Sequence, residues 1–352
     1  MNSFYAMNKL FARSLFSLFI ASLLLLGACS NKTKGIEMQI NLERSQKKRI
    51  SLPDFCDSIK LFPLQYNNAD SISYLQIDKF SVSDGGIFIL ENDGKGISRF
   101  DYSGNYMTSI KIDSTITDFY VTGDKALDIL SGNKFYTYDL STMSFDRFFE
   151  IDDLSYSIFK IARRINDPYK HSDVVVSKGY NLKGDFTSEY YLSDSSLFVI
   201  DSQLEILHEF LPIGESYGNF FSCNDTLYFQ YAGNGSIWRY SAFFSPKYQW
   251  KVSTKRCDSI LFKKAQMSER DLYMQIYTPT AEYIAVIDKE LKNYYSITEL
   301  RDGKIFPLGS IWNNSNYFIC NSQDLHKYLD DRITESYNFT DRNPVVIQYF
   351  LH

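Results

Sequence analysis

Residues 87–110 read IFILENDGKGISRFDYSGNYMTSI. Two short strands are predicted there, Ile87–Leu90 and Gly96–Phe100, separated by a polar Asn-Asp-Gly turn. A third strand is expected from Tyr106, after the turn at Asp101–Gly104. Short apolar segments separated by Gly, Asn and Asp are typical of β-hairpins. The stretch therefore predicts consecutive antiparallel strands.

The end of this unit recurs along the chain as an apolar or aromatic strand followed by a polar residue. The residues that mark each recurrence are Asp101, Asp139, Asp201, Ser241 and Asp288. Most intervals between these markers are 38 to 47 residues, a spacing typical of propeller blades with four short strands each. An Asp at a strand end can accept hydrogen bonds from turn amides, so we interpret these aspartates as structural.

The strand segments from Ile59 to Phe350 accommodate six blades. Residues 325–333 read as a short helix or polar loop, and the apolar segment Asn343–Phe350 follows them. A terminal strand can pair with strands from the other end of the chain and remove an exposed edge. Pro63 predicts that the strand near Ile59–Tyr66 lies at a sheet edge or bulge. We therefore predict an all-β fold, a six-bladed β-propeller.

The N-terminus resembles a lipoprotein signal peptide. Lys9 and Arg13 precede the uncharged apolar run Leu15–Leu26, and Leu-Gly-Ala-Cys29 resembles a bacterial lipobox. A transmembrane helix is the alternative, but the run is short for a span. We expect a signal peptide at 1–28, acylation of Cys29, a tether and lead-in at 29–58 and the propeller at 59–352. The lipid would anchor the protein to the outer membrane. The residues directly after Cys29, Ser-Asn-Lys-Thr-Lys-Gly, include no acidic residue, which favours the periplasmic face over the cell surface.

The composition limits the possible partners. The net charge is −5, becomes about −7 without residues 1–28, and no Lys/Arg cluster indicates nucleic-acid binding. The four remaining cysteines permit disulfides in three pairings, or free buried thiols, which suits Cys320. No CxxC spacing exists, so no metal site is expected. The four cysteines are Cys56, Cys223, Cys257 and Cys320.

Motifs for chemistry are missing, but one segment has an unusual surface. The sequence has no phosphate-binding loop, HExxH or GxSxG, so we assign no catalytic residue and no cofactor. The 62-residue interval between Asp139 and Asp201 implies an insertion of roughly 20 residues within Asp152–Ser188. This segment is either a solvated connection or a binding rim for a carboxylated sugar or peptide carboxylate. The candidate ligand-binding residues are Arg163, Arg164, Tyr169, Lys170 and His171.

Four features together resemble the six-bladed β-propeller lipoproteins of Gram-negative bacteria, which have NHL-like propellers. They are the lipobox, the Ile-Lys-Leu-Phe-Pro-Leu64 segment, the first blade and the terminal Asn-Pro-Val-Val-Ile347 strand. The resemblance implies a propeller over about residues 36–352 and transfers no catalytic residue. Lys111–Ile116 departs from the Gly-Pro-Gly-Glu-like turn that such proteins often have.

Two classes of function remain open. The first is an envelope binding or scaffolding module for a glycan, a peptide or a partner protein. The alternative is a propeller enzyme, a lyase or hydrolase acting on an envelope or dietary polysaccharide or on a peptide. The absence of a motif for histidine or metal chemistry favours a binding module that is not an enzyme.

Overall fold

The computed structural model separates the chain into two compact units, Met1–Gly35 and Ile36–His352. All described residues belong to the second unit, and among them no helix is long and apolar enough to span a membrane. The described residues are 36–42, 50–65, 77–91, 94–122, 124–132, 134–150, 157–163, 174–179, 195–200, 206–213, 218–223, 226–231, 236–240, 246–254, 260–290, 293–298, 300, 302–337 and 343–352.

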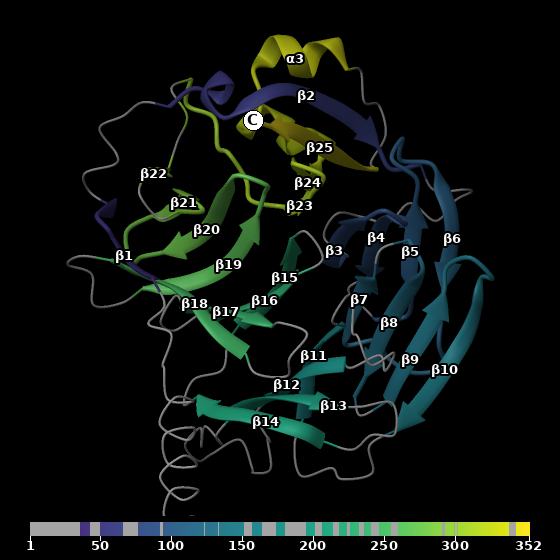
Figure 1. Cartoon of the computed structure of the whole chain (residues 1–352). Helices are drawn as coiled ribbons and strands as arrows, with labels where there is room; N and C mark the ends of the chain where they lie inside the picture. Colours follow the sequence, from purple (N-terminus) through teal and green to yellow (C-terminus); the bar gives the residue numbers. More distant parts are fainter. Residues whose placement is uncertain are drawn as a thin grey trace, which may run out of the picture. The chain divides into compact units, whose positions relative to one another are not determined.

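Six β-sheets form the blades of a propeller (Figure 1). Blade 1 contains β3 (Ile77–Ser83), β4 (Gly86–Glu91), β5 (Ile97–Phe100) and β6 (Tyr106–Ile110). Blade 2 contains β7 (Asp118–Thr122), β8 (Ala126–Ser131), β9 (Lys134–Asp139) and β10 (Ser144–Glu150). Blade 3 contains β11 (Ser157–Arg163), β12 (Val174–Gly179), β13 (Ser195–Ile200) and β14 (Ile206–Ile213).

Blades 5 and 6 also have four strands each, and blade 4 has five. Blade 4 contains β15 (Gly218–Cys223), β16 (Thr226–Tyr231), β17 (Ser236–Tyr240), β18 (Pro246–Thr254) and the added β1 (Ile36–Ile40). Blade 5 contains β19 (Leu261–Met267), β20 (Asp271–Tyr277), β21 (Glu282–Asp288) and β22 (Tyr294–Ile297). Blade 6 contains β23 (Ser310–Trp312), β24 (Ser315–Asn321), β25 (Pro344–Leu351) and β2 (Cys56–Pro63).

The six blades close in a ring. The first strand of each blade contacts the first strand of the next, and β23 contacts β3. Polar bonds join these strands: Lys79 Nζ lies 2.5 Å from Asp118 Oδ1, and Val82 N donates to Ser310 Oγ at 3.3 Å. Apolar side chains of neighbouring blades pack between the sheets, and we call each such packing zone a seam. The predicted six-bladed β-propeller is confirmed.

Blade 6 is closed by the two ends of the propeller. β25 pairs with β24 on one side and antiparallel with β2, from the N-terminal part of the unit, on the other. Val345, Val346, Ile347 and Tyr349 of β25 are fully buried, each contributing roughly 1.5–3 kcal/mol. The predicted pairing of the chain ends is confirmed, and so is the edge position of Pro63, because β2 is the outermost strand.

The added strand β1 lies within the segment that the sequence analysis reads as tether and lead-in. It pairs in parallel with β18, from Ile36 opposite Trp250 to Ile40 opposite Thr254. Its Met38 and Ile40 side chains are buried, while Glu37 and Gln39 are exposed. This alternation is that of a strand with one covered face.

The marker aspartates lie where the third strand of a blade ends. Asp101 Oδ1 accepts hydrogen bonds from the amides of Ser103 and Asn105, and Asp139 Oδ1 accepts from Ser141 and Thr142. Hydrogen bonds from the Ser141 side chain and from these amides lower the pKa of Asp139 to about 2. The structural interpretation is confirmed for these residues; Asp201 and Ser241 lie outside the described part of the chain.

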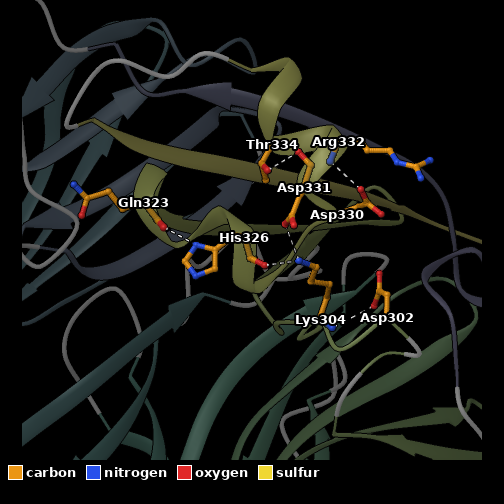
Figure 2. A network of polar contacts seen from close by, with 8 residues as sticks. All are labelled: Asp302, Lys304, Gln323, His326, Asp330, Asp331, Arg332 and Thr334. Atoms are coloured by element: carbon orange, nitrogen blue, oxygen red, sulfur yellow. Dashed lines mark hydrogen bonds and ion pairs between the residues drawn. The ribbon is translucent and has the colours of Figure 1, made fainter.

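A short helical segment connects β24 with β25, as expected for residues 325–333. It contains the 3-10 helix η3 (Ser322–Lys327) and α3 (Asp331–Ser336); a further 3-10 helix, η1 (Leu52–Asp54), precedes β2. Asp330 caps α3, because its Oδ1 accepts a hydrogen bond from Arg332 N at 2.8 Å. Figure 2 shows this segment beside Lys304, which belongs to the connection between β22 and β23.

Candidate binding site

The predicted binding rim falls on blade 3 and remains a prediction. The segment Asp152–Ser188, within which the insertion is expected, contains two blade strands, β11 and β12. Arg163 ends β11 and pairs with Val174, whereas Lys178 pairs with Ile158 toward the other end of the hairpin. The remaining candidate residues are outside the described part of the chain, as is Cys29: Arg164, Tyr169, Lys170 and His171.

A different set of side chains forms an aromatic ladder on blade 2, which we define as Tyr136, Tyr138, Phe145 and Phe148. Phe145 lies opposite Tyr138 with ring centroids 5.1 Å apart, and Phe148 lies opposite Tyr136 at 4.9 Å. Tyr136 and Phe145 also contact diagonally, at 6.0 Å. Tilted and edge-to-face pairs at these distances are favourable, so the four rings support one another.

A β-bulge in β10 creates the ladder. Side chains three residues apart on a regular strand point to opposite faces. The register shifts between Phe145 and Arg147, so one extra residue, Asp146, is accommodated there. The shift brings Phe145 and Phe148 to the face that carries Tyr136 and Tyr138.

The ladder extends the seam between blades 1 and 2 toward solvent. Tyr138 is buried in the apolar cluster that contains Phe88 of blade 1 and Leu127 of blade 2, and Tyr136 packs against the same cluster. Phe145 is 46% exposed and Phe148 is 55% exposed. The inner half of the ladder therefore belongs to the core, and the outer half presents two aromatic rings to solvent.

Arg99 of blade 1 lies on the other side of this seam. Its Nε donates to Gly85 O at 2.8 Å, and its Nη1 donates to Leu140 O of blade 2 at 3.4 Å. The guanidinium stacks over Phe88, 5.7 Å from the ring centroid, and interacts electrostatically with Tyr138. Both hydrogen-bond acceptors are neutral carbonyls, and burial lowers the pKa of the guanidinium. Arg99 therefore places a partly desolvated cation beside the aromatic ladder.

Met143 adds a third exposed apolar side chain at the start of β10. It is 54% exposed and has a φ of 57°, in the left-handed region that disfavours residues with a Cβ. The backbone of this turn would suit glycine better.

The polar network in Figure 2 is a second cluster of charged side chains, and its geometry is structural. Lys304 Nζ donates to His326 O at 2.9 Å and lies 3.0 Å from Asp331 Oδ1. Its side chain is 18% exposed, whereas that of Asp331 is 72% exposed. Lys304, in the β22–β23 connection, therefore binds both η3 and α3 through these two contacts.

The described cysteines are free thiols and poor nucleophiles. Burial raises the pKa of Cys56 to about 11 and that of Cys320 to about 12, so both are protonated at neutral pH. Cys223, also free, is half-buried, and its pKa is raised by burial against the opposing effect of Lys289. Of the two alternatives, disulfides or free thiols, the structure has free thiols at these three positions. Cys257 lies outside the described residues. Within the described chain no three His, Cys, Asp or Glu side chains gather as a metal-binding group.

The ladder could have been found in the sequence only in part. The segments Lys134–Tyr138 and Ser144–Phe149 are rich in aromatic residues and read as strands, and they correspond to β9 and β10. Simple alternation, however, puts Phe145 and Phe148 on opposite faces. The sequence gives only a weak signal for the bulge. Asp146 is exposed in β10, and a polar residue on the solvated side of a strand is expected with or without a bulge.

Comparisons with known proteins identify the fold. No protein-family model and no curated protein sequence matches the chain. An exported protein from Bacteroides fragilis matches with a TM-score of 0.62 and 14% identity, over 90% of this chain and 99% of that chain. Virginiamycin B lyase from Staphylococcus aureus matches with a TM-score of 0.48 and 14% identity, over 74% and 82%. Regucalcin from Agrobacterium tumefaciens, a calcium-binding protein, matches with 0.47 and 12%, over 82% and 95%. At these identities the likeness shows the fold alone, which is that of a β-propeller.

Proposed function

We propose that this protein is a lipid-anchored envelope protein whose propeller binds a partner protein at the seam between blades 1 and 2. The observation that carries the proposal is the aromatic ladder, which begins in the core at Tyr138 and ends in the exposed rings of Phe145 and Phe148. Half-exposed rings on a rigid base lose little conformational freedom when a partner covers them.

The residue types of the seam favour a protein as the ligand. Aromatic residues, methionine and arginine are enriched in protein–protein interfaces, and Tyr and Arg dominate their energetics. The ladder and Arg99 supply these types at one seam, and the exposed Met143 directly precedes β10 on the blade that carries the ladder. Planar rings with an arginine would also suit an acidic sugar, and the experiment below separates the two ligands.

Contacts through side chains fit this edge better than strand pairing. β10 is the outermost strand of its sheet among the described strands. The bulge and the exposed charge of Asp146 are devices that discourage a second strand from adding to an edge. A partner is therefore expected to cover the rings and to leave the β10 backbone solvated.

Anchoring in the envelope is supported by the sequence. Lys9 and Arg13, the apolar run and Leu-Gly-Ala-Cys29 have the order of a lipoprotein signal, and acyl chains on Cys29 would give stable attachment. An exported protein with the same fold is consistent with this location. Membrane fractionation of a Cys29→Ser variant tests it, since loss of acylation should release or misprocess the protein.

The binding proposal is tested by site-specific photo-crosslinking in intact cells. A photoreactive phenylalanine analogue replaces Phe148, and in a matched control it replaces Leu261, which is 46% exposed on β19 of blade 5. We expect a discrete adduct at position 148 that is sensitive to protease and disappears in a Phe145→Ser background. No such adduct is expected at position 261.

Two results would contradict the proposal. One is equal crosslinking at positions 148 and 261, which would show non-specific contact with envelope proteins. The other is an adduct at position 148 that resists protease and is competed by acidic oligosaccharides, which would identify the ligand as a glycan.

A further inference from the structure

The strand β1 attaches the N-terminal end of the unit to the seam between blades 4 and 5. Met38, Ile40 and Leu42 are buried in one apolar cluster with Phe262 and other residues of blade 5. Beyond the strand, Asn41 N donates to the hydroxyl of Tyr294 in β22 at 2.9 Å. β1 is therefore fixed both to the sheet of blade 4 and to its neighbour.

This attachment shortens the connection between the propeller and Cys29. Cys29 and Ile36 are seven residues apart, which spans at most about 25 Å of extended chain. If β1 were not paired, the first fixed strand would be β2, and the 27 residues from Cys29 to Cys56 could span about 95 Å. Pairing of β1 thus converts a long tether into a short one.

We infer that β1 orients the propeller on its membrane, with the seam between blades 4 and 5 toward the lipid surface and the aromatic ladder away from it. The inference rests on the proposed acylation of Cys29. In a ring of six blades, the seam between blades 4 and 5 lies three blades from the seam between blades 1 and 2 in either direction. A short tether at the first seam therefore leaves the second facing away from the lipid.

The outward side chains of β1 agree with approach to a lipid surface without insertion. Glu37 and Gln39 are exposed and polar, while Met38 and Ile40 are buried against the propeller. The orientation accordingly depends on the length of the chain between Cys29 and β1. The consequence for function is that a partner can reach the ladder without competing with the membrane.

The test uses the full-length acylated protein in vesicles of phosphatidylethanolamine and phosphatidylglycerol that contain a headgroup-quencher lipid. A fluorescent amino acid replaces Glu37 in one sample and Phe148 in the other. We expect strong quenching at position 37 and little at position 148. A Gly/Ser linker of about 20 residues inserted between Gly35 and Ile36 leaves β1 intact and should reduce the difference between the two positions.

The outcomes separate the inference from the proposed function. Equal quenching at both positions in acylated, vesicle-bound protein would overturn the orientation and leave the anchor in place. A difference that persists unchanged with the inserted linker would also overturn it, because tether length would then not matter. Failure of the wild type to be acylated and to bind vesicles would overturn the anchor, and the orientation with it. A second variant, Met38→Asp with Ile40→Asp, should reduce the difference by releasing β1.

Discussion

Phe145 and Phe148 lie on the same face of β10, although three positions separate them in the sequence. The bulge at Asp146 makes this possible, because it inserts one residue without a partner between their cross-strand pairs. The result is a ladder with a buried half and an exposed half. A ligand could use the exposed half without any change in the packing of the blade.

Replacing Met143 with glycine should stabilise the protein. Met143 is 54% exposed and has a φ of 57°, so the variant removes a left-handed backbone cost of roughly 1 kcal/mol with little loss of burial. Urea unfolding should show a higher midpoint with an unchanged slope. A lower midpoint would show that the methionine side chain contributes more packing than its exposure indicates.

Deleting the terminal strand Pro344–Leu351 should unfold the propeller. Four of its side chains are fully buried, and their removal costs several kcal/mol, a large part of the stability of a typical domain. The deletion also exposes the edges of β2 and β24. Circular dichroism and thermal melting provide the measurement, and a truncated protein that melts at the wild-type temperature would contradict the prediction.

Lys304→Met should loosen the segment between β24 and β25. The variant keeps most of the apolar stem but removes the donor to His326 O and the ion pair with Asp331, for a loss of about 1 kcal/mol, since Asp331 is well exposed. Hydrogen exchange should accelerate at the amide of Ile305, which donates to Lys327 O. The matched control is Lys327→Met, because the Lys327 side chain is 50% exposed whereas that of Lys304 is 18% exposed. Equal acceleration in both variants would rule out a specific role for Lys304.

Acid should weaken the turn at Asp139. Its folded pKa is about 2, below the unfolded value near 3.9, so its contribution is present above about pH 4 and is lost as the pH falls toward 2. Asp139→Asn cannot titrate. The difference in urea midpoint between wild type and variant should therefore shrink between pH 5 and pH 2, measured at intervals. A difference that stays constant over this range would show that the charge of Asp139 does not matter.

Local patterns predict the blades well and the contacts between distant strands poorly. The sequence predicts that the chain ends pair, because an apolar terminal strand needs a partner, and that Pro63 lies at an edge or bulge, because it lacks an N–H donor. It does not predict that β1 joins a blade, although Ile36–Ile40 alternates between apolar and polar residues. Its parallel partner β18 is more than 200 residues away, and no local pattern specifies that pairing.

Charge and aromatic content favour a site at Arg163 and the residues after it, whereas the structure presents the aromatic ladder on blade 2. The ladder depends on a bulge and on packing against the neighbouring blade. Arg99 stands in the stretch that predicts the fold, but its proximity to Leu140 follows from the packing of blade 1 against blade 2. Long-range packing of this kind cannot be derived from spacing along the chain.

The most direct test of the central claim is an affinity measurement with purified proteins. The partner identified by photo-crosslinking is titrated against variants of the aromatic ladder. Phe145→Ser with Phe148→Ser should weaken binding by roughly 10-fold or more, the scale of interface hot spots, in protein that circular dichroism shows to be folded at the assay temperature. Leu261→Ser, which removes a similarly exposed apolar side chain from blade 5, should bind as the wild type does. Unchanged affinity in the double variant would show that the partner binds elsewhere on the propeller and would contradict the account.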